Sequence, residues 1–295
     1  MHHFFLFWLN RREKCVTIIK LGGAYMRRTL AIIGCGNMGG AIAEGIIKSG
    51  YMAPENMILM RRNTAALSDF AERGCVVTDD IKQACSEADA VMLCVKPQMI
   101  SAVMADIAHI RGDKLFISIA VGTTVETIQN ALPGCPVVRV MPNTPLMVGC
   151  GVSAICTSSN CSDEDKAFAA GLFECAGSVV FIDEEQMNPV AGVTSSSIAF
   201  FARFIGAMAE WAKENGFAYM DDAELLSLVC DAASGTAKLL KDKGMTCGEL
   251  VRAVASPKGT TEAGLRSFDE TDLEGSVKKA LTASNERAKE IARMK

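Results

Sequence analysis

Short apolar runs alternate with helical patterns over the first two thirds of the chain. Each run holds four to six mostly β-branched or aliphatic residues, the composition of strands whose two faces are both buried. The runs are 29–33, 57–60, 75–78, 90–95, 115–120, 137–140, 151–156 and 178–182. Their alternation with helices predicts right-handed βαβ units and a parallel sheet covered by helices.

Strand signals cease from Gln186 onward, and the remaining pattern has helical periodicity throughout. The predicted helices are 189–215, 221–241, 246–255 and 273–294. The first of them is apolar almost all round and long enough to raise the question of a membrane span. Arg203, Glu210 and Lys213 within it favour a helix covered by protein instead. Because one small helical domain can hardly cover such a helix, we expect a second subunit to do so.

The first run leads directly into the glycine motif 34–39, Gly-Cys-Gly-Asn-Met-Gly, and then into a helix predicted from Met38 to Ser49. Strand, G-x-G-x-x-G and helix in this order predict a dinucleotide site in which the pyrophosphate lies on the helix N-terminus. The alternative is a purely structural glycine-rich turn. The predicted cofactor-binding residues of this turn are Gly34, Gly36, Asn37, Met38 and Gly39.

The second run ends in Arg61, Arg62 and Asn63, where an NAD-selective site usually places a carboxylate on the ribose 2′-hydroxyl. Two guanidinium groups suit a 2′-phosphate, which predicts NADPH as the cofactor, with NADH possible. The alternative is a solvated pair of arginines in a loop. The fold class is then α/β, with an N-terminal Rossmann-type parallel sheet domain over residues 26–185 and an all-α dimerisation domain over residues 186–295.

Residues 1–25 differ from the rest of the chain. Their apolar stretch 1–9 is too short to span a bilayer, and the basic residues follow it, whereas a signal peptide has them in front. We expect a non-structural extension, with Met26 as the natural start of the protein.

The amino-acid composition limits the classes of binding partner and the cellular compartment that we expect. The net charge of −4 argues against nucleic acid and anionic membrane surfaces. The twelve cysteines are scattered through apolar segments without C-x-x-C pairs, which predicts free, buried thiols in a reducing cytoplasm and no metal site.

The residues available for proton transfer are few. Of the three histidines, two lie in the extension and His109 lies near the end of a predicted surface helix. The stretch 192–202 holds no lysine, which a β-hydroxyacid dehydrogenase would need there for the alcohol proton. Hydride transfer to an already protonated cyclic imine fits this chain better, since the protein then supplies mainly orientation and carboxylate recognition.

Two polar loops could supply that recognition. Residues 139–145, Arg-Val-Met-Pro-Asn-Thr-Pro, follow a predicted strand at the edge where open α/β sheets bind ligands. Residues 256–261, Ser-Pro-Lys-Gly-Thr-Thr, precede a helix whose first N–H groups could hold a carboxylate. The structural alternatives are a turn fixed by two prolines for the first loop and a simple helix cap for the second.

From Met26 to the C-terminus the chain resembles the pyrroline-5-carboxylate reductases. The resemblance is carried by residues 33–39 and 94–98, together with the two loops above. It implies a Rossmann domain, a helical domain that forms homodimers and often decamers built from dimers, and NAD(P)H-dependent reduction of 1-pyrroline-5-carboxylate to L-proline. It places Cys94, Lys96 and Pro97 beside the cofactor, Pro142 and Asn143 near the nicotinamide, and Thr260 and Thr261 on the substrate carboxylate.

Two segments depart from the family pattern. The usual Ser-Gly-Ser-Gly-Pro-Ala-Tyr reads Thr-Ser-Ser-Ser-Ile-Ala-Phe at 194–200, which keeps a serine at Ser196 as a candidate catalytic residue, and Lys258 replaces a usual glycine. Three hypotheses follow: a proline-forming reductase, a paralogous reductase of another cyclic imine or keto acid, and a catalytically silent NADP-binding regulator.

Overall fold

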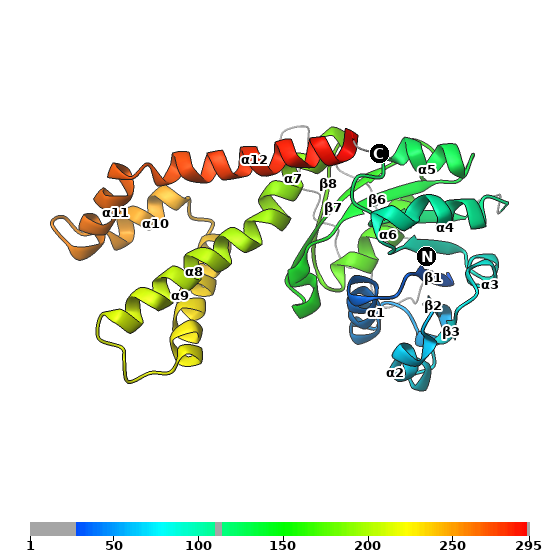
Figure 1. The fold of residues 1–295 in the computed structure, drawn as a ribbon, viewed down its shortest axis with the longest axis horizontal. Coiled ribbons are helices and arrows are strands. Elements are labelled where there is room, and N and C mark those ends of the chain that lie inside the picture. Colours follow the sequence, from blue (N-terminus) through cyan, green and yellow to red (C-terminus); the bar gives the residue numbers. More distant parts are fainter. Residues whose placement is uncertain (1–27, 110–113, 294–295) are drawn as a thin grey trace, which may run out of the picture. The chain divides into compact units, whose positions relative to one another are not determined.

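The computed structural model describes residues 28–109 and 114–293 (Figure 1). The predicted extension 1–25 and the predicted start at Met26 lie outside the described residues. The described chain divides into two compact units, one of residues 28–191 with 288–293 and the other of residues 192–287. Each unit is described by itself below, as unit 1 and unit 2.

Unit 1 is built on one eight-stranded sheet with the strand order β3-β2-β1-β4-β5-β6-β7-β8. The strands are β1 Leu30–Ile33, β2 Met57–Met60, β3 Val76–Thr78, β4 Ala90–Leu93, β5 Leu115–Ser118, β6 Val137–Met141, β7 Gly151–Thr157 and β8 Gly177–Phe181. The order of the first six strands is that of dinucleotide-binding sheets, with its switch point between β1 and β4. All eight predicted strands are present, with ends that differ by one or two residues.

The prediction of a wholly parallel sheet is wrong for one pair, because β7 runs antiparallel to β6. Residues 142–150 join the two strands and contain only the short 3₁₀ helix η4, Thr144–Val148. A parallel connection needs a crossover of about a dozen residues or more, so this linker can only reverse the chain. The next connection contains α6, Asp163–Glu174, and β8 accordingly returns parallel to β7.

Helices cover both faces of the sheet, which explains why its strands are apolar on both sides. On one face α6 and α1, Asn37–Ser49, bury Ile42, Ile46, Phe168 and Phe173 against alternate strand residues. The other face packs against α3 Ile81–Glu87, α4 Ile100–Ile107 and α5 Val125–Ala131. The shorter elements are η1 Pro54–Asn56, η2 Thr64–Leu67, α2 Ser68–Glu72, η3 Pro97–Met99, η5 Glu184–Gln186 and α7 Met187–Ala191.

Unit 2 is helical. Its elements are the π-helical turn η6 Gly192–Ser196, α8 Ser197–Glu214, α9 Asp222–Lys243, α10 Cys247–Val254, α11 Thr260–Glu270 and α12 Leu273–Arg293, the last of which ends in unit 1. Capping boxes begin α9 and α10, with Asp221 and Thr246 as the capping residues. The helix predicted from residue 189 begins at Met187 and contains the π turn, for which the hydrophobic pattern held no signal.

Helix α8 exposes an apolar stripe on unit 2. Phe201, Phe204, Met208 and Trp211 recur at helical spacing and are between 45% and 65% exposed. By length and composition, residues 184–214 form one helix that could cross a membrane, yet only 11% of its apolar window is buried within the chain. The described residues of unit 2 therefore leave this apolar stripe uncovered.

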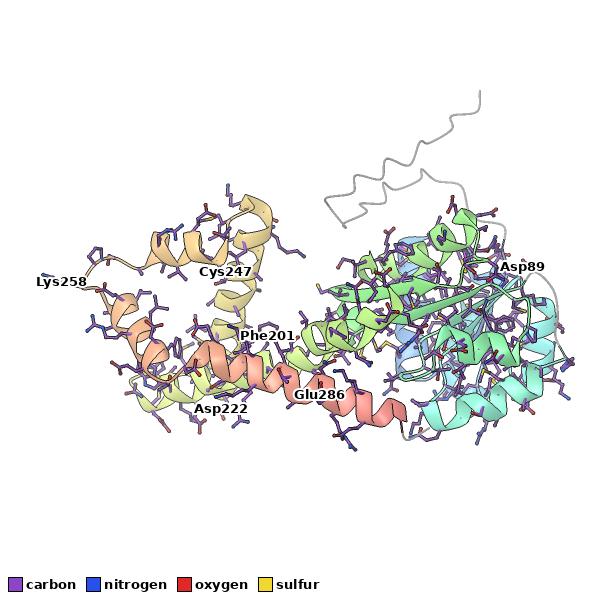
Figure 2. All side chains as sticks on the ribbon, turned by 90° about the horizontal axis from the view of Figure 1, so that it is seen from above. Asp89, Phe201, Asp222, Cys247, Lys258 and Glu286 are labelled. Carbon is purple, nitrogen blue, oxygen red and sulfur yellow. The ribbon has the colours of Figure 1, made fainter. Side chains whose placement is uncertain are left out.

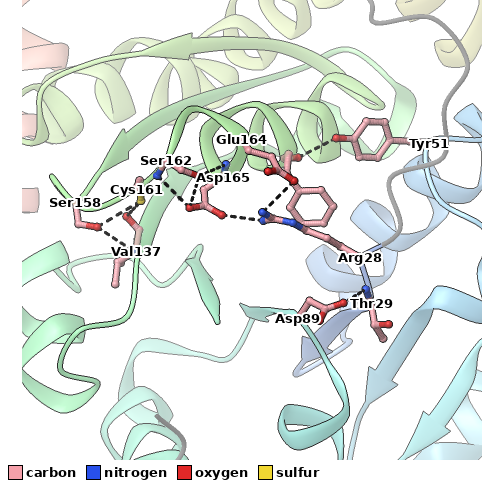
Figure 3. A network of polar contacts seen from close by, with 11 residues as sticks. Arg28, Thr29, Tyr51, Asp89, Val137, Ser158, Cys161, Ser162, Glu164 and Asp165 are labelled. Carbon is pink, nitrogen blue, oxygen red and sulfur yellow. Dashed lines mark hydrogen bonds and ion pairs between the residues drawn. The ribbon is translucent and has the colours of Figure 1, made fainter. Parts of the chain in front are cut away.

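A polar network ties the start of β1 to α6 in unit 1 (Figure 3). The Arg28 guanidinium donates to Asp165 Oδ1 over 2.8 Å and lies 5.3 Å from the centre of the Phe168 ring. Asp165 Oδ2 also accepts from the backbone and side chain of Ser162, which caps α6. Burial alone would raise the pKa of the Asp165 carboxyl, but the hydrogen bonds from Arg28 and Ser162 outweigh it and lower that pKa.

The lowered pKa of Asp165 predicts a contribution to acid stability. A carboxyl whose pKa is lower in the folded chain stabilises it above the unfolded value of about 4, and the contribution is lost as the pH falls through the folded value. Asp165→Asn should therefore cost about 2 kcal/mol at pH 7 and flatten the loss of stability below about pH 4. Urea unfolding at pH 7, 5 and 3 checks this. Equal losses of stability between pH 5 and pH 3 in both proteins would contradict it.

Candidate active site

The glycine motif forms the tight turn between β1 and α1 in unit 1. Gly34 has a φ of +87°, and a Cβ there would lie 2.7 Å from Val95 Cγ1. A Cβ on Gly39 would lie 3.2 Å from the Gly34 carbonyl oxygen, whereas the nearest atom to a Cβ on Gly36 is 3.9 Å away. Gly34 and Gly39 are thus required by local packing, and the space over Gly36 is open to a ligand.

The N-terminus of α1 offers free hydrogen-bond donors at this turn. Gly36 is its capping residue, no side chain caps the helix, and its first turn holds no acidic residue. The N–H groups of Asn37, Met38 and Gly39 therefore point out of the helix end beside the β1–β4 switch point. An uncapped helix N-terminus over an open glycine fits the pyrophosphate of a dinucleotide.

Arg61, Arg62 and Asn63 follow β2 next to this turn. The backbone N–H groups of Gly34 and Cys35 donate to the carbonyl of Met60, which fixes the end of β2 against the glycine motif. Arg61 is half-buried and Arg62 is exposed, and in the part of the chain that the structure describes no carboxylate forms an ion pair with either. Both guanidinium groups are therefore available to a 2′-phosphate.

The segment after β4 lies against the glycine motif from the other side. Cys94 is half-buried, its backbone donates to the carbonyl of Ile33, and its Cβ would lie 3.3 Å from a Cβ on Gly39. Lys96 is exposed and caps η3, which begins at Pro97. The structure thus brings Cys94 and the glycine motif together, with Lys96 and Pro97 directly following.

Burial disfavours the thiolate form of the two cysteines at this turn. Burial raises the pKa of Cys35 to about 11 and also raises the pKa of Cys94, where the nearby Cys35 adds to the effect. Thiolates are the reactive form, so neither residue favours redox chemistry here. The described cysteines are all free, as predicted, and six of the eleven are buried; Cys94 and Cys175 are half-buried, and Cys150, Cys230 and Cys247 are exposed. The described residues contain no cluster of ligands that could hold a metal ion.

Asn143 follows β6, and its side chain is 6% exposed. Its Oδ1 accepts a hydrogen bond of 2.8 Å from the backbone N–H of Val152, which joins the end of β6 to the start of β7. Pro142 before it is half-buried. The side chain of Asn143 therefore links the two strand ends, and its amide oxygen already has a partner there.

A buried ion pair near this turn was missed by the sequence reasoning. Arg139 on β6 is 5% exposed and donates over 2.7 Å to Glu184 Oε1, which also accepts from the backbone N–H of Val125 at the start of α5. An arginine within an otherwise apolar strand was the signal that such a partner exists, because a buried charge requires one.

Ser196 lies in the π turn of unit 2, where its Oγ accepts a hydrogen bond of 2.7 Å from Ser284 on α12. The hydroxyl of the next residue, buried Ser197, donates back to the carbonyl of Val193. The segment that departs from the family pattern, residues 194–200, thus overlaps the π turn, a geometry often found at functional sites.

Thr260 and Thr261 begin α11, which Gly259 caps without any side-chain hydrogen bond. Thr260 is exposed, and Thr261 lines a cavity of about 500 Å³ between α9, α10 and α11 whose other walls are mainly apolar. Lys258 and Glu262 flank them, with the Lys258 backbone N–H donating to Glu262 Oε2 over 2.7 Å. The free N–H groups at this helix start could hold a carboxylate, although the Glu262 carboxylate lies in the same turn.

Lys258 has a φ of +59°, in the left-handed region that favours glycine. Lys258→Gly should therefore stabilise the protein by about 0.5–1 kcal/mol. The matched control is Lys241→Gly in the last turn of α9, which should destabilise by about 1 kcal/mol because glycine is unfavourable within a helix. Urea unfolding of the two variants checks the opposite signs, and a loss of stability in both would contradict the expectation.

Within unit 2 the threonine loop and the serine turn do not meet. Figure 2 shows Lys258 at one end of the helical unit and Glu286, close in sequence to Ser284, towards the other end. Ser284 lies eleven residues into α12, about 16 Å along its axis from the helix start. In this view the loop before Thr260 and the part of α12 that holds Ser284, the partner of Ser196, therefore lie towards different ends of unit 2.

Comparisons with known proteins agree with these features. The family described as pyrroline-5-carboxylate reductase dimerisation matches residues 184–291, and the family described as NADP oxidoreductase coenzyme F420-dependent matches residues 29–122. The pyrroline-5-carboxylate reductase of Methanosarcina acetivorans is 36% identical over 90% of this chain and 98% of its own.

Two solved structures have the same fold. The pyrroline-5-carboxylate reductase of Coxiella burnetii superposes with a TM-score of 0.83 at 30% identity, covering 89% of this chain and 98% of the other. The Plasmodium falciparum pyrroline carboxylate reductase, solved with NADP bound, has a TM-score of 0.80 at 24% identity and covers 91% and 100%. The resemblance seen in four sequence motifs is confirmed: identity above 30% across nine tenths of the chain shows that it belongs to the pyrroline-5-carboxylate reductase family.

Proposed function

We propose that this protein reduces 1-pyrroline-5-carboxylate to L-proline with NADPH. The observation that carries the proposal is the N-terminus of α1, with no side-chain cap, at the open Gly36, beside Arg61 and Arg62, neither of which forms an ion pair within the described residues. The family membership supplies the substrate class, since the relatives in the comparison carry the name of this reaction.

The residues of unit 1 would hold and orient the cofactor. The N–H groups of Asn37, Met38 and Gly39 would bind the pyrophosphate, and Arg61 with Arg62 the 2′-phosphate. Lys96, Pro97, Pro142 and Asn143 follow strand ends at the edge of the sheet where ligands bind in such folds, in agreement with the positions implied by the resemblance.

The residues of unit 2 would bind the substrate. Thr260 and Thr261 would hold the carboxylate through their N–H and hydroxyl groups, and Ser196 would contact the ring. Bound NADPH supplies a hydride to the imine carbon, the C=N electron pair passes to the nitrogen, and the proton already on that nitrogen stays on the product amine. No side chain has to transfer a proton in this step, which agrees with the scarcity of histidines in the chain.

A homo-oligomer is part of the proposal. The dimerisation family covers α8 with its apolar stripe, and a second copy would bury that stripe. A second copy would also bring a threonine loop to the serine turn, since the two lie towards different ends of unit 2 in Figure 2. We propose a homodimer as the smallest active form, with decamers built from dimers as a further possibility. The protein would act in the cytoplasm, where its free thiols stay reduced, without nucleic-acid or membrane partners.

The experiment is NADPH consumption by the purified protein with 1-pyrroline-5-carboxylate, with a panel of other cyclic imines and a control without substrate. Rapid turnover with proline as the product supports the proposal. Turnover of another cyclic imine alone would favour the paralogous reductase, and cofactor binding without turnover would favour the silent regulator. The combined change Ser195→Gly, Ser197→Gly and Ile198→Pro should leave an active enzyme nearly unchanged and should restore activity to a silent one.

A further inference from the structure

Two buried oxygen atoms on neighbouring segments of unit 2 lack hydrogen-bond partners. In the described chain only three buried side-chain atoms are in this state: Ser153 Oγ, Ser195 Oγ and Asn285 Oδ1. Ser195 belongs to the π turn and Asn285 to α12. These two segments are in contact, because Ser284 Oγ donates to Ser196 Oγ over 2.7 Å and a Cβ on Gly192 would lie 3.8 Å from the Leu281 side chain.

An unpaired buried polar atom is unfavourable, and native structures contain few of them. Two on adjoining segments indicate a group that is missing from the isolated chain. Their place in a π turn agrees with this, since π turns often widen a helix at a functional site. The Ser196–Ser284 hydrogen bond beside them fixes the separation of the turn from α12.

To satisfy both atoms, a ligand needs a hydrogen-bond donor and a hydrogen-bond acceptor. A serine hydroxyl can donate a hydrogen bond, whereas an amide oxygen can only accept one. An isolated carboxylate or a fully ionised phosphate ester has only acceptors, so it would leave Asn285 Oδ1 unpaired and place negative charge against it. A protonated cyclic imino acid carries an N–H donor next to a carboxylate acceptor and satisfies both atoms.

We propose that Ser195 and Asn285 form a subsite for the nitrogen edge of a cyclic imino acid. Asn285 Oδ1 accepts from the ring N–H, and the Ser195 hydroxyl donates to the adjoining carboxylate. The Ser196–Ser284 hydrogen bond holds the two sides of the subsite together. The inference rests on the proposed function and deepens it. It assigns substrate recognition to Ser195, which lies in the segment where this chain differs from the family pattern.

The subsite has a consequence for the pH dependence. An acceptor on the ring N–H favours the protonated form of the substrate, which is the form that accepts a hydride. The titratable group whose behaviour changes is the substrate nitrogen, because neither Ser195 and Asn285, which form the subsite, nor Ser196 and Ser284 beside them carry an ionisable side chain. Removing the acceptor should therefore make kcat fall at a lower pH on the alkaline side, because kcat reports the protonation of the bound substrate.

The test uses the full chain and steady-state kinetics with 1-pyrroline-5-carboxylate and NADPH. Asn285→Leu removes the acceptor at similar volume and should raise the KM for the imine about 10-fold, with the KM for NADPH within about twofold of the wild type. It should also shift the alkaline limb of kcat to lower pH. Asn285→Asp keeps an acceptor and should restore most of the affinity. The control is Thr282→Val, an exposed residue of the same helix that bonds only its own helix backbone.

The outcomes separate the inference from the proposed function. An active wild type whose Asn285→Leu variant keeps the same KM and pH profile would overturn the subsite and leave the reductase intact. A wild type without turnover would overturn both. If Asn285→Leu does not fold, Ser195→Ala removes a single oxygen and should raise the KM for the imine about threefold or more, again without changing the KM for NADPH. An unchanged KM for the imine in that variant would equally overturn the subsite.

Discussion

Replacing Arg61 and Arg62 together by alanine should raise the KM for NADPH about 100-fold and leave the KM for NADH within about threefold of the wild type. The two guanidinium groups stand at the end of β2 without carboxylate partners in the described chain, so their hydrogen-bonding capacity is available to the 2′-phosphate. Charge-assisted hydrogen bonds contribute about 1.5–3 kcal/mol each, and only NADPH carries the group that receives them.

Steady-state kinetics with NADPH and with NADH measures the two KM values and tests this prediction. The double lysine variant, Arg61→Lys with Arg62→Lys, keeps the charge but loses the planar fork and should lie between the wild type and the alanine variant. Arg73→Ala is the matched control, because this arginine of unit 1 is already paired with Glu44 over 2.6 Å. Equal losses for NADPH and NADH would show that the pair does not read the 2′-phosphate.

Glu184→Ala should lower the free energy of unfolding by about 3 kcal/mol. The change leaves the guanidinium of Arg139 buried without its carboxylate and takes the acceptor from the Val125 N–H. Breaking a buried ion pair typically costs about 3–5 kcal/mol; the lower end applies because a third of the Glu184 side chain is exposed.

Urea unfolding measures this loss. Glu184→Gln keeps an acceptor for both donors and should cost less than half as much as the alanine variant. Glu185→Ala is the control, an exposed neighbour with no ion pair in the described chain, and should change the stability by less than about 0.5 kcal/mol. A Glu184→Ala variant as stable as Glu185→Ala would show that Arg139 reaches water or another acceptor.

The sequence predicted the strands and the cofactor half of the site because these depend on local patterns. Buried parallel strands are continuous apolar runs, and the functions of Gly34 and Gly39 follow from the turn alone. The direction of β7 could also have been predicted, since residues 142–150 are too few for a crossover.

Other features depend on contacts between residues distant in the sequence. The bond between Arg139 and Glu184 joins residues 45 apart, and Ser196 and Ser284 are 88 apart. The spacing of hydrophobic residues along the chain does not indicate such pairs. The π turn likewise leaves the spacing of apolar residues along the helix almost unchanged. Ser195 and Ser196 therefore match the pattern of an ordinary helix start, although they belong to a widened turn. The sequence did not indicate that Asn285 is buried, because the same polar residue in an amphipathic helix can face either water or a buried partner.

The exposed stripe on α8 links the folding of unit 2 to protein concentration. Trp211 is 63% exposed in the single chain and is the one tryptophan among the described residues. When a second copy covers the stripe, the indole moves from water into an apolar contact, so its fluorescence emission should shift to shorter wavelength on association. Dilution would then reverse the shift and lower the melting temperature together, because a chain that gains part of its core from a partner loses stability when partners become scarce.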